Sequence, residues 1–242
     1  MTETRALIAA AGRGSRAGLS YPKTLFRVQE RPILLRICEV LRPYDPQPTI
    51  VVSPSGEGPI AECLQQAGLA AHFVRQPEPK GMGDAVLRFA ESPAFTTANH
   101  VLLSWGDVPF LQPETVAAMV EAHSCKGNDF TFVSRVVSSP YTIVLRNDLG
   151  EVRGVLETRE AGLTPPPKAE RDIGLFIFRK DPVFDRLREE LPGKRGSGTG
   201  EHGFLYVIGY LAGTGCKVAA LPIAKEIETV SLNSVRDLVG YA

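Results

Sequence analysis

The sequence predicts an α/β fold, in which a parallel sheet is flanked by helices and extended by antiparallel strands in the second half of the chain. Apolar, β-prone runs alternate with helical periodicity over residues 1–125, and this order is typical of parallel strands joined by helices. From residue 126 onward, strand-like runs follow one another, with a hairpin turn signal between two of them. In a sheet of this kind we expect a ligand beyond the carboxyl ends of the strands.

Four strands and four helices are predicted in the first half. The strands are Ala6–Ala10, Thr49–Ser53, Ala71–Arg75 and His100–Ser104. The first predicted helix is Ile33–Leu41, which is apolar on most sides. The second contains Ile60, Cys63, Leu64 and Ala67, which follow the i, i+3, i+4, i+7 stripe of a helix. The other two are Gly83–Ala90 and Glu114–Ala122, the latter preceded by Pro113, which suits a first helical turn. We expect the helices to cover both faces of the sheet.

In the second half of the chain, strand-like runs follow one another with fewer helices between them. Its predicted strands are Phe130–Val137, Thr142–Leu145, Glu151–Leu156 and Gly174–Phe178, its predicted helices are Pro182–Leu191 and Phe204–Ala212, and its predicted loops are "GLTPPPKAE" and "PGKRGSGTGEHG". The segment "RNDLGEV" is a hairpin turn signal. The antiparallel strands are expected to extend the sheet. The alternation of Lys225, Glu226 and Glu228 predicts a solvated strand edge.

Composition excludes several classes of function. The chain has 242 residues, 43% of them hydrophobic and 22% charged, and 27 basic residues balance 27 acidic ones. This balance predicts no attraction to nucleic acid or to an anionic membrane. No apolar run approaches the roughly 20 residues that span a bilayer, and the four cysteines lack C-x-x-C spacing, which predicts reduced core residues. We therefore expect a cytoplasmic protein with one domain, 1–242.

The stretch "LIAAAGRGSRAGLSYPK", residues 7–23, contains three glycines among small residues and cations. Glycine lets a backbone approach a ligand closely, and successive N–H groups in such a turn can hold an anion. The spacing fits neither a P-loop nor the G-x-G-x-x-G dinucleotide fingerprint. A tight turn after a strand would also explain the glycines, but the neighbouring cations favour a phosphate site.

Two further segments carry polar residues at strand ends. "GDVP", which contains Asp107, is either a strand-end turn or a metal site. Gln76 follows a strand, and its amide offers both a donor and an acceptor, as the N3–H and O4 of uracil or thymine require. A flipped amide would accommodate cytosine, and a surface glutamine is the plain alternative. The four histidines share no ligand spacing, so a zinc site is not predicted.

The glycine loop followed by "PKTL" resembles the signature of the sugar-phosphate nucleotidyltransferases. Three later segments agree in order: "RQPEPKGMGDAV" with the base-binding segment, "LLSWGDVPFL" with the metal segment and "VSLNSVRDL" with the closing motif. The resemblance is greatest to the uridylyltransferase domain that makes UDP-N-acetylglucosamine. It implies a Rossmann-like mixed sheet and a Mg²⁺-dependent attack of a sugar 1-phosphate on a nucleoside triphosphate, UTP or dTTP being favoured, with release of pyrophosphate.

The same resemblance implies a role for each motif residue. It assigns catalysis to Arg16 and Lys23, and Mg²⁺ binding to Asp107 and Asn233. The residues expected to bind the nucleotide are Ala10, Ala11, Gly12, Gly14, Ser15, Gln76, Gly81 and Met82. Residues 1–125 are the expected nucleotide-binding half and residues 126–242 the sugar-binding half.

The predicted acceptor site departs from the family pattern. Thr142 stands where the pattern has glycine, and Asp172 where it has asparagine, whereas Glu157 matches the glutamate that contacts sugar hydroxyls. These three are the predicted substrate-binding residues, and an acceptor with an amine or more hydroxyls would suit Asp172. The alternatives are a cytidylyl- or guanylyltransferase with another phosphorylated acceptor, and a non-catalytic nucleotide sensor. A homo-oligomer is possible.

Overall fold

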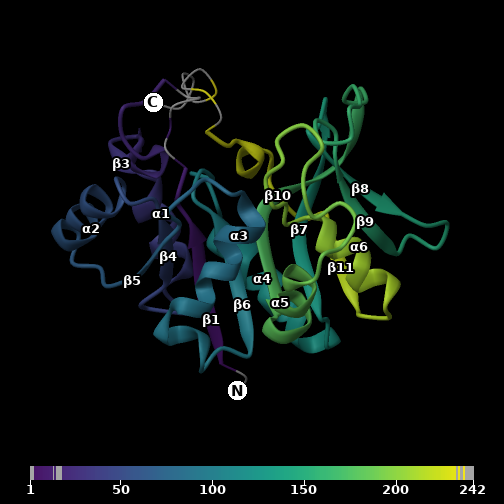
Figure 1. Ribbon diagram of the computed structural model, residues 1–242, viewed down its shortest axis with the longest axis horizontal. Helices are drawn as coiled ribbons and strands as arrows, with labels where there is room; N and C mark the ends of the chain where they lie inside the picture. Colours follow the sequence, from purple (N-terminus) through teal and green to yellow (C-terminus); the bar gives the residue numbers. More distant parts are fainter. Residues whose placement is uncertain (1–2, 13, 15–17, 233, 235–236, 238–242) are drawn as a thin grey trace.

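A computed structural model describes residues 3–12, 14, 18–232, 234 and 237 of the chain. Seven strands form one central sheet with helices on both sides (Figure 1). In spatial order the strands are β11 (Val218–Leu221), β7 (Phe130–Ser138), β10 (Lys168–Arg179), β6 (His100–Trp105), β1 (Thr4–Ala9), β4 (Thr49–Val52) and β5 (His72–Arg75). All neighbouring strands are parallel except at β10, which is antiparallel to both β6 and β7. The predicted α/β fold is therefore confirmed.

Two apolar cores lie on the two faces of the sheet. Ala6 and Ile8 of β1 point into one core and Leu7 into the other, as alternation along a strand requires. The first core is covered by α1 (Ile33–Leu41), α2 (Glu57–Gln66) and α4 (Pro113–Lys126), and the second by α3 (Met82–Leu87), α5 (Lys180–Arg188) and α6 (Tyr206–Gly213). Short 3₁₀ helices are η2 (Lys23–Leu25), η3 (Arg88–Glu91), η4 (Pro93–Phe95) and η5 (Glu226–Thr229). Within the described residues, no helix is long and apolar enough to cross a membrane.

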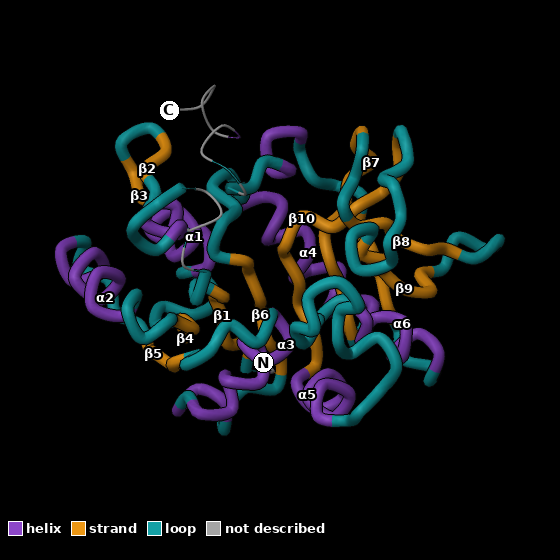
Figure 2. The backbone as a smooth tube through the Cα atoms, turned by 45° about the horizontal axis from the view of Figure 1, so that its top comes forward, coloured by secondary structure: helices purple, strands orange, loops and turns teal. Residues whose placement is uncertain are grey.

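The strands β8 (Thr142–Arg146) and β9 (Val152–Glu157) correct one expectation. They form the predicted hairpin, but it is a separate two-stranded sheet beside α6 and does not extend the central sheet (Figure 2). A Cβ on Gly154 would lie 3.5 Å from the Cα of Gly209, so β9 approaches the α6 backbone closely. The edge beside β7 is occupied by β11, a strand that the sequence analysis did not predict.

A second correction concerns the segment that ends in η5. Glu228 is only 1% exposed, whereas its spacing predicted a solvated edge. Its carboxylate accepts hydrogen bonds from the backbone N–H groups of Gln112 (3.0 Å) and Lys225 (2.8 Å) and from Oγ1 of Thr115 (2.8 Å). Gln112 immediately precedes α4, and a buried carboxylate at a helix N-terminus is favourable. Both oxygens of the Glu228 carboxylate therefore accept hydrogen bonds inside the protein.

The predicted burial of the cysteines holds only in part. Cys38 is buried, Cys63 and Cys216 are half-buried, and Cys125 is exposed near the end of α4.

Two short strands, β2 (Arg27–Val28) and β3 (Arg31–Pro32), form a further hairpin that was not predicted.

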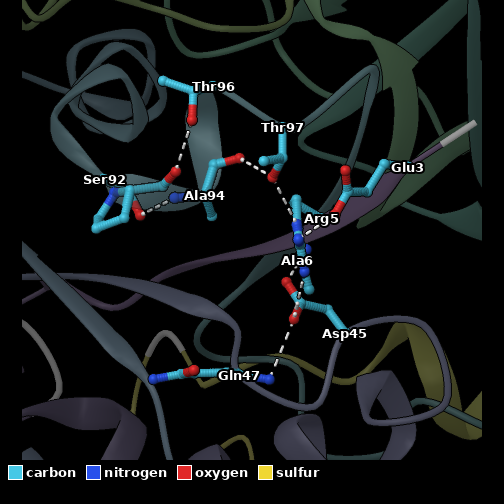
Figure 3. A network of polar contacts seen from close by, with 10 residues as sticks. Glu3, Arg5, Ala6, Asp45, Gln47, Ser92, Ala94, Thr96 and Thr97 are labelled. Carbon is cyan, nitrogen blue, oxygen red and sulfur yellow. Dashed lines mark hydrogen bonds and ion pairs between the residues drawn. The ribbon is translucent and has the colours of Figure 1, made fainter.

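A polar network holds the amino end of β1 (Figure 3). Asp45, which is buried, accepts hydrogen bonds from the backbone N–H groups of Ala6 (2.9 Å) and Gln47 (3.1 Å). Arg5 donates from Nε to Oγ1 of Thr97 at 3.1 Å. These contacts tie β1 to the segments beside it at one end, while the opposite end of the strand opens into the candidate site.

Candidate active site

The candidate site lies where β1 and β6 end side by side. The chain leaves β1 toward β4 on one side and returns through β6 on the other, and ligands of open α/β sheets bind at such a switch point. The N–H of Gly106 donates to the carbonyl oxygen of Ala9 at 3.0 Å. A Cβ at position 106 would lie 2.7 Å from that oxygen. Glycine at 106 therefore allows the two loops to touch.

Two glycines of the first loop, Gly12 and Gly14, lie close to other parts of the protein, whereas a Cβ added to Gly18 would meet open space. A Cβ on Gly12 would lie 2.8 Å from Cε of Lys23. Gly14 has φ +77°, and its Cβ would lie 2.7 Å from the carbonyl oxygen of Tyr21. Ala10 donates to the carbonyl of Val51 at 2.9 Å, which continues the pairing of β1 with β4. The loop is thus folded back over the segment that carries the predicted lysine.

Lys23 and Asp107 form an ion pair, although they are 84 residues apart in sequence. Lys23 begins η2, and Asp107 follows β6 directly. Asp107 is 8% exposed. Nζ of Lys23 contacts Oδ2 of Asp107, whereas Oδ1 is buried and receives no hydrogen bond from any residue that the structure describes. An ionised carboxylate oxygen without a partner is costly inside a protein, so Oδ1 is suited to receive a cation.

The closing segment of the chain reaches the same place. The N–H of Leu232 donates to the backbone carbonyl of Asp107 at 2.9 Å. Asn233, the second predicted Mg²⁺ ligand, lies outside the described residues, as do Ser15 and Arg16. Their roles stay predictions. The described start of the predicted closing motif, which includes Leu232, therefore lies next to Asp107.

The predicted base-reading residues lie together after β5. Gln76 is 6% exposed, and its N–H continues the sheet by donating to the carbonyl of Val52 at 2.8 Å. Its side-chain Nε2 donates to the carbonyl oxygen of Gly81 at 2.9 Å. Gly81 has φ +99°, and Met82 begins α3. The structure therefore joins the glutamine to the loop of Gly81 and Met82.

A segment that sequence reasoning missed packs on this loop. His202 donates its N–H to the carbonyl of Lys80 (2.7 Å) and accepts from the N–H of Gly83 (2.9 Å). A Cβ on Gly83 would lie 2.1 Å from the carbonyl oxygen of Gly203. Only the glycines in "GEHG" could have indicated such a contact, and the sequence assigned them to a flexible loop. The second half of the chain thus supports the base-reading loop of the first.

The three predicted acceptor residues have different surroundings. Thr142 and Asp172 are fully buried, and Oγ1 of Thr142 donates to Oδ1 of Asp172 at 2.6 Å. Oδ2 of Asp172 accepts from the N–H of Gly174 at 2.9 Å. Burial raises the pKa of Asp172, while the Thr142 hydrogen bond opposes that rise. A contact between Asp172 and an acceptor would require this internal pairing to open, so its substrate-binding role, like that of Thr142, stays a prediction.

Glu157 is more available than Asp172. Glu157 pairs with Thr142 across the β8–β9 hairpin. It also lies near Gly203, because a Cβ added to Gly203 would be 3.9 Å from Oε1 of Glu157. Burial raises its pKa, and the negative charges of Asp172, Glu160 and Glu201 raise it further. This acidic environment favours a proton, an amine or hydroxyl donors at the Glu157 carboxylate.

Trp105 lies against the wall of the same region. Its ring centroid is 5.6 Å from that of Phe176, and a Cβ on Gly174 would lie 2.8 Å from its ring. Gly174 has φ +78° within an irregularity of β10, which makes room for the indole. Nε1 of Trp105 is buried and finds no acceptor in the described part of the chain.

A mostly parallel sheet with a glycine loop, a lysine and a buried aspartate at its switch point is typical of nucleotidyltransferases. Two solved structures share the fold. UDP-glucose pyrophosphorylase complexed with UDP-glucose superposes with a TM-score of 0.77 at 18% identity, covering 100% of this chain and 97% of that chain. A Bacillus anthracis protein, provisionally assigned as a glucose-1-phosphate thymidylyltransferase and bound to sucrose, has a TM-score of 0.72 at 17% identity, covering 90% and 87%.

The chain belongs to the family of MobA-like NTP transferase domains, which matches residues 6–163. It is also similar to bifunctional GlmU proteins. The relative from Heliobacterium modesticaldum is 27% identical over 237 residues, covering 97% of this chain and 50% of the relative. The one from Pelotomaculum thermopropionicum is 29% identical over 238 residues, covering 96% and 50%. The chain thus spans about half the length of the curated relatives it matches. The family predicted from the motifs is confirmed.

Proposed function

We propose that the chain transfers a nucleotidyl group from UTP or dTTP to a sugar 1-phosphate with Mg²⁺, giving an NDP-sugar and pyrophosphate. The observation that carries this proposal is the Lys23–Asp107 pair beside the glycine loop, with Oδ1 of Asp107 buried and without a hydrogen-bond partner among the described residues. The names of the two structural neighbours, which refer to UDP-glucose and to a glucose-1-phosphate thymidylyltransferase, support the choice of base and acceptor.

The residues at the site fit a Mg²⁺ ion. Asp107 offers one hard oxygen to which none of the described residues donates, and we assign Asn233 as the second ligand. No group of three or more His, Cys, Asp or Glu side chains gathers into a metal site in the described part of the chain. Mg²⁺ prefers few protein ligands, together with water and phosphate oxygens. When bound, the ion would neutralise the negative charge of the triphosphate.

The reaction needs charge neutralisation more than proton transfer. The attacking phosphate oxygen is an anion near neutral pH, so no general base is required, and catalysis comes from alignment and electrostatic stabilisation. In the proposed mechanism Lys23 neutralises the α-phosphate and the incoming phosphate, Arg16 holds the β- and γ-phosphates, and the loop N–H groups cradle the triphosphate. The nucleotide contacts thus come from residues 1–125 and the acceptor contacts from residues 126–242, within one domain.

A second acceptor class is favoured by the surroundings of Glu157. Burial, and after it three further carboxylates, raise the pKa of Glu157, and a phosphorylated acceptor with an amine would neutralise part of this negative charge. We therefore include both a sugar 1-phosphate and an amine-bearing phosphate ester in the substrate panel.

The test measures pyrophosphate release with UTP, dTTP, CTP and GTP against that panel, with Mg²⁺ and with excess EDTA. Lys23→Ala and Asp107→Asn should each reduce turnover by roughly 10²–10⁴-fold, because each removes charge stabilisation at the transferring group. Lys126→Ala, at an exposed position far along α4, serves as the control and should retain turnover. A variant at 23 or 107 with more than about a tenth of wild-type turnover would remove that residue from the mechanism.

Other results of the same panel select the alternatives. Preference for CTP or GTP would indicate a cytidylyl- or guanylyltransferase. Nucleotide binding without pyrophosphate release from any pair would indicate a sensor and overturn the proposal.

A further inference from the structure

The amide of Gln76 uses both of its N–H donors inside the protein. Nε2 donates to the carbonyl oxygen of Gly81 at 2.9 Å and to Oδ2 of Asp84 at 2.9 Å. An amide nitrogen carries two hydrogen atoms, so these two bonds exhaust it. No described residue donates to Oε1 of Gln76 in return. The oxygen is the part of the amide left for a ligand.

Both acceptors are held in place by α3. Gly81 immediately precedes the helix, and its carbonyl also accepts from the N–H of Ala85 at 3.1 Å. Asp84 lies in the first turn, and its other oxygen contacts Nη2 of Arg88 at 3.4 Å. The side chain of Asp84 is 17% exposed. Arg88 is held in turn by Glu91 at 2.8 Å.

Turning the amide over would place Oε1 against two oxygens. The carbonyl of Gly81 and the carboxylate of Asp84 can only accept hydrogen bonds. A buried acceptor that faces other acceptors loses its hydrogen bonds and is repelled by the carboxylate charge. The flip that would let Gln76 serve either pyrimidine is therefore opposed.

We infer that Asp84 is a positioning residue, which locks the Gln76 amide with its oxygen toward the nucleotide and thereby selects uracil or thymine over cytosine. The inference rests on the proposed function and on the role predicted from the sequence, in which Gln76 contacts the base. Oε1 can accept from the N3–H of uracil or thymine, but the unprotonated N3 of cytosine presents an acceptor to it. A mismatch of this kind discriminates more strongly than a missing contact, because buried polar groups remain unpaired.

The lock can be tested without any nucleotide. In Gln76→Glu, a carboxylate without donors faces Asp84 and Gly81, so we expect the melting temperature to fall by about 5 °C or more. Adding Asp84→Asn supplies a donor to the carboxylate introduced at position 76 and should restore at least half of that loss. Glu78→Gln, at an exposed position in the same loop, serves as the control and should add independently to Gln76→Glu. Effects of Gln76→Glu and Asp84→Asn that simply add would overturn the lock.

The selection is tested by kcat/KM for UTP and CTP with the same acceptor. In Asp84→Asn the new amide can donate to a flipped Gln76, so the UTP:CTP ratio should fall about tenfold, through a higher KM for UTP and a lower KM for CTP. Asp84→Ala leaves the Gly81 carbonyl as one acceptor and should shift the ratio less. A ratio unchanged within twofold in Asp84→Asn would refute the selection, even if the stability cycle shows coupling.

The two measurements separate this inference from the proposed function. A wild-type protein that turns over no pyrimidine nucleotide would overturn the proposed function and the selection with it, while the stability cycle would still report on the lock. A wild-type protein that turns over UTP, together with an unmoved ratio, would overturn the selection alone.

Discussion

Replacing Glu228 by glutamine tests how the end of the chain is fixed beside the site. The carboxylate of Glu228 accepts three hydrogen bonds, from Gln112 on one oxygen and from Thr115 and Lys225 on the other. These contacts bind the segment that leads to Leu232, whose N–H donates to the carbonyl of Asp107. Because glutamine keeps the size and shape of glutamate, the change tests charge and hydrogen bonding and not packing.

The expected cost follows from these three bonds. Whichever way the amide of glutamine turns, its NH₂ group faces at least one donor, so one charge-assisted bond of about 1.5–3 kcal/mol is lost. The remaining bonds become neutral and weaken by roughly half. The sum is on the order of 3–6 kcal/mol, or about 6–24 °C in melting temperature for a chain of this size.

Thermal and urea unfolding of Glu228→Gln measure this cost directly. Glu226→Gln, in the same 3₁₀ helix but exposed, is the matched control and should stay within about 0.5 kcal/mol of wild type. We also expect a higher Mg²⁺ concentration for half-maximal turnover in Glu228→Gln, because the segment before Asn233 is loosened. If Glu228→Gln were as stable as Glu226→Gln, the carboxylate would not hold this segment, and the reasoning would be wrong.

Two further predictions concern stability. Burial lowers the pKa of His123 to about 4 in the folded protein. Between about pH 6.5 and 4, this imidazole therefore binds a proton in the unfolded chain but stays neutral in the folded protein. Stability should therefore be lost as the pH falls from about 6.5 to 4, by up to ~3 kcal/mol, and unfolding measured across that range should show a weaker dependence in His123→Gln. Gly83→Ala should destabilise by at least ~1–3 kcal/mol and weaken nucleotide binding, because its Cβ would lie 2.1 Å from the carbonyl oxygen of Gly203. Gly58→Ala, in α2 with open space around its Cβ, should instead stabilise by up to ~1 kcal/mol; equal effects of the two glycine changes on unfolding would contradict this account.

The sequence by itself determined most of the elements and their order, but not the strands β2, β3 and β11. Helix α1 was predicted with its observed bounds, Ile33–Leu41, and the parallel strands β1, β4, β5 and β6 to within two residues at either end, because apolar periodicity is a local property of the chain. The glycine loop, Lys23, Asp107 and Gln76 could also be selected from the sequence. Their chemistry depends on residue type and on their place after a strand.

Only the tertiary structure decided which of these groups meet and which way they face. Glu228 is buried because the amino end of α4 lies 116 residues away in sequence but next to it in space. Asp172 faces Thr142 and not solvent, and Asp84 fixes the direction of the Gln76 amide. The position of the β8–β9 hairpin depends on the close approach of Gly154 to Gly209. Periodicity records which face of an element is apolar, but the partner of a buried polar group is set by segments distant in sequence, and only the folded chain brings these together.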